Sequence, residues 1–206
     1  MYQVLAATSE TLRQMLIASM AADVGPSGLA AFFTGTTTVS LETPHEMIEA
    51  GRRGLSLWLY RVARDENRLN DPPEVRTLPT GDVEVIPTPL PVRLHYLVTP
   101  IAPASPDTEQ RILGRALQLF HTHPIASGAF LRAELAGTPA QLHVHLEALA
   151  LEEITRVWEA LDGSYQLSVS YEVSLTRIEA RSDPLRATLV ESVHPETAVL
   201  VGSEEV

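Results

Sequence analysis

The stretch from residue 165 to 176, YQLSVSYEVSLT, constrains the fold most, because apolar and polar residues alternate through it without a fault. A period of two sends successive side chains to opposite faces of a β-strand. One face carries Tyr165, Leu167, Val169, Tyr171, Val173 and Leu175, and the other carries Gln166, Ser168, Ser170, Glu172, Ser174 and Thr176. The pattern predicts a half-buried strand of an antiparallel sheet.

Further strands are expected at four places along the chain. A short strand is predicted near residues 36–42, and residues 55–64, LSLWLYRVAR, are apolar on both alternating faces, which suits a central strand. Residues 92–99 alternate again, and so do residues 141–149, QLHVHLEAL. The predicted core face of residues 92–99 consists of Val92, Leu94, Tyr96 and Val98.

Three segments show the 3.6-residue apolar period of amphipathic helices. The first ends before Gly25, the second follows Ser105 and runs to about Phe120, and the third covers residues 151–161. The third places Ile154, Val157, Trp158 and Leu161 on one stripe, which we expect to be buried. Together these elements predict an α/β fold of the α+β type: a single domain with a mostly antiparallel four- to five-stranded sheet and helices packed on one face.

Two regions lack these periods. Residues 65–91 contain six prolines and are predicted to form a protruding contact loop. Residues 182–206 hold two short β-prone runs, RATLV and TAVLV, separated by Pro195. We therefore expect a domain over residues 1–180 and a C-terminal tail over residues 181–206, which either docks on a partner by strand addition or packs as an edge strand on its own domain.

The residue types that are missing exclude several mechanisms. The sequence contains no cysteine and no lysine. Thiolate nucleophiles, cysteine zinc sites, Schiff-base catalysis and the P-loop all need one of these residues. The chain also has no G-x-S-x-G motif, and Glu152 and Glu153 are explained by stabilisation of a helix N-terminus. We therefore expect no enzyme activity.

Charge and hydropathy limit the possible partners. The formal net charge of -11 repels phosphate backbones and anionic lipid headgroups, so neither nucleic acid nor a membrane is an expected partner. The longest apolar run near the start, residues 15–22, is far short of the roughly 20 residues that span a bilayer. The first residues lack the basic region of a secretory signal, which predicts assembly in the cytoplasm.

The histidines raise the possibility of a metal site. In QLHVHLEAL, strand alternation sends His143, His145 and Glu147 to one polar face. His121 and His123 form a second His-x-His pair near a helix end, where residues two apart point about 200° apart and cannot both chelate. We expect no metal or other cofactor, with a metal-dependent hydrolase using the two pairs as the alternative.

Four stretches together carry a family resemblance. They are LWLYRVARDENRLNDPP (57–73), PLPVRLHYLVTPIA (89–102), QRILGRALQLFHTHPI (110–125) and WEALDGSYQLSVSYEVSLTRIE (158–179). This combination resembles the cap proteins, or tail terminators, of phage-tail-like contractile injection systems, and the resemblance extends to about Ile178. It implies a structural protein that forms a homo-hexameric ring at the end of an inner tube and its sheath. A head-to-tail adaptor of a phage tail shares that ring architecture and is a further alternative.

The polar sheet face and the tail supply the candidate partner-binding residues. On the sheet they are Arg93, His95, His143 and His145, and in the tail they are Leu189, Val199 and Val201. If helices cover one sheet face, the other is available to the tube lumen or to neighbouring subunits. Solvation alone is the alternative explanation of such a face.

Overall fold

In the computed structural model, the chain forms two compact units. The first contains Met1–Asn70 and Pro89–Ala180, and the second contains Asp71–Thr88 and Arg181–Val206. The residues that the structure describes are 3–26, 28–35, 37–68, 72–80, 82–86, 89–178 and 185–187. No helix in these ranges is long and apolar enough to cross a bilayer.

The first unit is built on a six-stranded sheet in the order β1-β2-β5-β8-β7-β6. Its strands are β1 (Thr38–Ser40), β2 (Gly54–Arg64), β5 (Leu90–Ile101), β6 (Ile125–Ser127), β7 (Gln141–Leu146) and β8 (Val169–Ile178). β1 and β2 are parallel, and the other neighbouring pairs are antiparallel. The predicted fold class is confirmed. The sheet exceeds the expected four to five strands because β6 has only three residues, too few to show a period.

Strand β8 is shorter at its start than the alternation predicts. Tyr165 and Leu167, expected on the buried face, are 47% and 42% exposed. Pairing of β8 with β5 begins at Val169 opposite Val98. Residues 165–168 alternate but have no neighbouring strand in this register, and a strand forms only where its amides find partners. Within β8, Tyr171 and Val173 are buried as expected.

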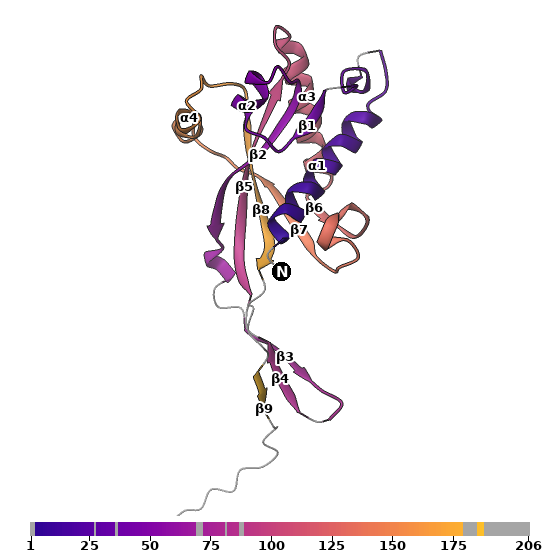
Figure 1. Ribbon diagram of the computed structural model, residues 1–206, viewed down its shortest axis with the longest axis vertical. Helices are drawn as coiled ribbons and strands as arrows, with labels where there is room; N and C mark the ends of the chain where they lie inside the picture. Colours follow the sequence, from indigo (N-terminus) through magenta and orange to yellow (C-terminus); the bar gives the residue numbers. More distant parts are fainter. Residues whose placement is uncertain are drawn as a thin grey trace, which may run out of the picture. The chain divides into compact units, whose positions relative to one another are not determined.

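Helices α1 (Val4–Ala22) and α3 (Pro106–Thr122) cover one face of the sheet, which we call the apolar face (Figure 1). The predicted core residues of β5 are at most 4% exposed. α1 buries Leu12, Leu16 and Met20 on the predicted stripe, and α3 does the same with Ile112 and Phe120. Short helical turns connect the larger elements: η1 (Leu29–Ala31), η2 (Glu66–Arg68), η3 (Gly128–Phe130) and η4 (Ala133–Leu135).

Helix α4 (Leu151–Ala160) packs on the opposite face, so the expectation that all helices share one face is wrong for this helix. Its buried Ile154 and Trp158 contact Leu97 of β5, with Trp58 and Tyr60 of β2 beside them. The reason is that β2 and β5 carry apolar side chains on both faces near Trp58 and Leu97, so the second face also needs a cover there. The expected burial of Trp158 is confirmed, since it is 2% exposed and donates to the Ser168 hydroxyl at 3.0 Å.

A further helix, α2 (Pro44–Glu49), begins with a capping box. The Thr43 hydroxyl accepts from the Glu46 amide at 3.1 Å, and the Glu46 carboxylate accepts from the Thr43 amide at 2.9 Å. This arrangement satisfies two amides that the helix itself leaves free. α2 contacts β2 and β5 of the large sheet.

The second unit contains a three-stranded sheet in the order β3-β4-β9. β3 (Glu74–Thr77) and β4 (Val83–Ile86) form an antiparallel hairpin, so the prediction of a loop over residues 65–91 is wrong here. β9 (Leu185–Ala187) pairs with β4, which shows that this part of the tail is an edge strand of its own chain. Prolines flank the short strands instead of interrupting them. A high proline content therefore did not mean that the segment lacks strands.

Candidate functional site

The site lies on the sheet face that α4 covers in part, which we call the mixed face. The register places His145 of β7 opposite Glu172 of β8, and Glu172 opposite His95 of β5. Residues directly opposite on one face of an antiparallel pair lie close enough to interact. Three strands far apart in the sequence therefore bring histidines and carboxylates into one row.

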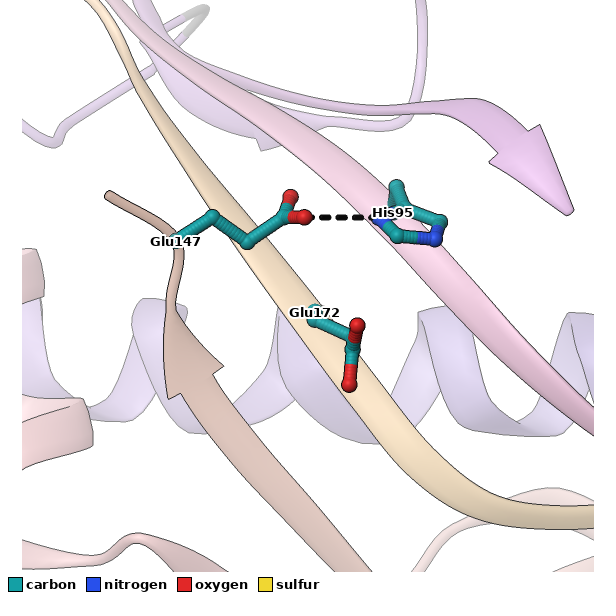
Figure 2. A group of neighbouring side chains, drawn as sticks. All are labelled: His95, Glu147 and Glu172. Carbon is teal, nitrogen blue, oxygen red and sulfur yellow. Dashed lines mark hydrogen bonds and ion pairs between the residues drawn. The ribbon is translucent and has the colours of Figure 1, made fainter. Parts of the chain in front are cut away.

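Glu147 and His95 form the centre of a hydrogen-bonded network. Glu147 follows the end of β7, and its Oε1 lies 2.9 Å from Nδ1 of His95, across β8 (Figure 2). Ser170 donates a short hydrogen bond to the other carboxylate oxygen. The Tyr60 hydroxyl lies 3.0 Å from the Ser170 hydroxyl and 3.5 Å from Glu147. His95 and Ser170 are buried, so these partners replace water.

The network holds Glu147 in its ionised form. Burial raises the pKa of the Glu147 carboxyl, but the hydrogen bonds from His95, Ser170 and Tyr60 and the electrostatic attraction of His95 together lower it by more, so the pKa lies below its ordinary value. Burial also raises the pKa of the Tyr60 hydroxyl, which keeps that group protonated. His95 donates through Nδ1 because an ionised carboxylate only accepts.

Arg93 connects the mixed face to the end of β2. Its guanidinium contacts Asp65 at 2.8 Å and Glu172 at 3.2 Å. Asp65 is buried and also accepts from the Asn67 amide at 3.1 Å. The hydrogen bond to Asp65 is the main reason why the pKa of Arg93 is raised. One guanidinium thus serves two carboxylates, which ties the segment after β2 to β5 and β8.

The candidate partner-binding residues occupy different environments. Arg93 and His95 belong to the network, and His95 is only 5% exposed. His143 is half-buried and His145 is exposed, with ring centroids 6.2 Å apart. Leu189, Val199 and Val201 lie outside the described residues. Partner binding by these residues stays a prediction.

The two His-x-His pairs do not combine into a metal centre in the described part of the chain. His121 lies in the last turn of α3, and His123 caps that helix with its ring 5.1 Å from Phe130. The described residues hold one group of three potential metal ligands whose donor atoms lie within 4.8 Å of one another, and it consists of His95, Glu147 and Glu172. This geometry does not support a hydrolase built on the two pairs.

The network also lacks the order needed to activate a serine nucleophile. In a serine triad the histidine lies between the hydroxyl and the acid, so that it can accept the hydroxyl proton. Here the Glu147 carboxylate lies between Ser170 and His95. Ser170 is also only 2% exposed. The arrangement orients and neutralises side chains, and it presents no nucleophile to a substrate.

Sequence reasoning found the polar faces but not the contacts between them. Alternation places Glu172 on the polar face of β8, and it places Glu147, just after β7, with His143 and His145. A single sequence does not show which strands are neighbours, so the contacts of Glu147 and Glu172 with His95 could not be predicted. No pattern in the sequence identifies Asp65 or Tyr60 as a site residue. The network residues come together only through the pairing register of the strands.

Two solved structures share the fold of this chain. One is the sheath/tube terminator of the extracellular contractile injection system PVC in its extended state, with 17% identity and a TM-score of 0.56. The other is the tube-terminating cap of the anti-feeding prophage, with 15% identity and a TM-score of 0.59.

The chain belongs to the Pvc16 N-terminal domain family, whose model matches residues 7–192. The two structural matches cover 96% of this chain but only 63% and 61% of those chains, so it spans about three fifths of their length. No curated protein matches the sequence.

Proposed function

We propose that this protein is a structural cap that terminates the inner tube and the sheath of a contractile injection system as a hexameric ring. The observation that carries this proposal is the shared fold over 96% of the chain with a sheath/tube terminator and a tube-terminating cap. The absence of an activated nucleophile in the mixed-face network agrees with a structural role. The expected partners are further copies of this chain, the tube protein and the sheath protein, with assembly in the cytoplasm.

A ring needs a contact surface between subunits, and the first unit exposes a suitable apolar surface. Ile48 of α2 is 40% exposed and Leu167 is 42% exposed. Both line a hollow of about 310 Å³ together with Ile101, Pro103 and the polar residues Glu109 and Gln166. Apolar side chains at the rim of a hollow are favourable places for a second protein surface. We assign this hollow to the contact with the neighbouring subunit.

The number of subunits in the ring is tested by mass photometry of the purified protein and by negative-stain images of the protein bound to tube ends. We expect sixfold rings for the wild type and loss of rings for the double variant Ile48→Glu with Leu167→Glu. Val24→Glu is the matched control, because Val24 is 80% exposed and is not part of the hollow. Caps of another symmetry contradict the hexamer, and intact rings in the double variant contradict the assigned surface.

The tail after β9 is the proposed partner-binding arm, which includes Leu189, Val199 and Val201. The support is that the sequence after β9 holds a further β-prone run, TAVLV, which suits strand addition to a sheet edge of a partner. Truncation after Ala187 keeps β9 and removes the rest. We expect a folded protein that caps tubes but binds the sheath less well, measured by co-sedimentation with assembled sheath. Unchanged sheath binding contradicts the arm.

A further inference from the structure

We propose that His95, Glu147 and Glu172 form a binding site for one divalent transition-metal ion, with Zn²⁺ as the best-suited probe. The three residues come from β5, from the segment after β7 and from β8 (Figure 2). One donor atom from each lies within 4.8 Å of the other two. This site is separate from the proposed capping role and does not depend on it.

The charges around Glu147 favour a cation. The Glu147 carboxylate is hydrogen-bonded to the hydroxyl groups of Ser170 and Tyr60 and to the His95 ring. The guanidinium of Arg93 contacts Glu172 and Asp65. Arg61 lies opposite His95 in the register and is exposed. An ionised carboxylate with little access to water is costly unless a cation is close. A divalent ion between Glu147, Glu172 and His95 supplies that charge.

The donor set fits this class of ion. Imidazole nitrogen and carboxylate oxygen both bind Zn²⁺ at about 2.0–2.2 Å, which sets neighbouring ligands of a tetrahedral ion about 3.3 Å apart. The His95–Glu147 contact of 2.9 Å is slightly shorter, so the pair opens a little when the ion replaces their hydrogen bond. Nδ1 of His95 releases its proton to solvent and Nε2 carries one, so the ring that binds the ion is a neutral imidazole. Glu172 turns from Arg93 toward the ion, and water takes the fourth position.

The burial of the three side chains suits a structural ion. His95 is 7% exposed in its side chain, Glu147 16% and Glu172 20%. The two carboxylates are partly accessible to solvent, so an ion can reach them. The buried imidazole is fixed by its surroundings and holds the ion in place. Bound there, the ion ties β5 and β8 to the segment that leads from β7 into α4. We expect it to stabilise the folded chain, since a ligand that binds only the folded state raises its stability.

Zn²⁺ titration of the full chain tests the site. Protein treated with EDTA and dialysed is titrated by isothermal calorimetry, and its melting midpoint is recorded with and without Zn²⁺. We expect one ion per chain and an upward shift of the midpoint. Glu172→Gln and Glu147→Gln keep the shape of the side chain but remove its charge, and each is expected to weaken binding at least about tenfold, the effect of losing a ligand or its support.

The control separates this site from the neighbouring histidines. The double variant His143→Gln with His145→Gln removes the His-x-His pair of the same face and is expected to keep the one-to-one binding. Glu172→Gln is the decisive variant if Glu147→Gln melts too low to titrate, because Glu172 is the more exposed of the two. No one-to-one binding by the wild type, unchanged binding in Glu172→Gln, or loss of binding in the histidine double variant overturns the proposal.

Discussion

The two faces of the six-stranded sheet are buried by different means. The apolar face packs aliphatic and aromatic side chains against α1 and α3, and the Ser9–Tyr96 hydroxyl contact of 2.8 Å is a local polar feature within it. The mixed face joins a small apolar cluster around Trp158 to the charged network of His95 and Glu147. Apolar packing is adaptable in its details, whereas a buried polar network depends on each particular partner.

Loss of Trp158 tests whether the mixed face has a core of its own. Trp158→Ala should lower the free energy of unfolding by about 3–5 kcal/mol, because it removes a large buried aromatic side chain and leaves a cavity. Chemical denaturation measures the change. Tyr165→Ala is the control, since Tyr165 is 47% exposed and its ring lies 6.3 Å from Trp158, and it should cost under about 1 kcal/mol. Equal effects would mean that the mixed face is not a core.

Neutralising Glu147 tests the polar half of that face. Glu147→Gln should cost about 1.5–3 kcal/mol at neutral pH, the range for a lost hydrogen bond to a charged group. The pKa of Glu147 lies below its ordinary value of 4.5, so its stabilisation is complete above about pH 4.5 and is lost as the pH falls through the folded-state pKa.

Thermal melts from pH 7 to pH 3 should therefore show the wild type and Glu147→Gln converging in acid. Glu159→Gln, on the exposed side of α4, is the matched control and should keep a constant offset from the wild type. A constant offset for Glu147→Gln as well would contradict the assigned role of its charge.

Two tyrosines give the smallest and most direct comparison of the faces. Tyr96→Phe removes a hydroxyl from a fully buried position on the apolar face and should cost about 1 kcal/mol. Tyr60→Phe on the mixed face should cost less, about 0.5 kcal/mol, because Tyr60 is only half-buried and Ser170 keeps its bond to Glu147. Denaturant midpoints of the two variants test the order, and the reverse order would contradict it.

The sequence predicted the apolar face well and the mixed face poorly, for a physical reason. Helical and strand periods report which residues share a face, so the stripes of α1 and α3 and the core of β5 follow directly from the residues. The His95–Glu147–Glu172 group depends on which strands are neighbours, and no local period carries that information. The strands β3, β4, β6 and β9 have three or four residues each, too few for a period to be distinct.

The central claim, that this protein terminates tubes, is tested most directly by measuring tube lengths in negative-stain images of particles from a strain that lacks it. An uncapped tube end keeps the surface on which the next ring adds, so we predict tubes of irregular or excessive length, with normal lengths restored when the wild-type chain is supplied again. Tubes of normal, uniform length in the deletion strain would contradict the account.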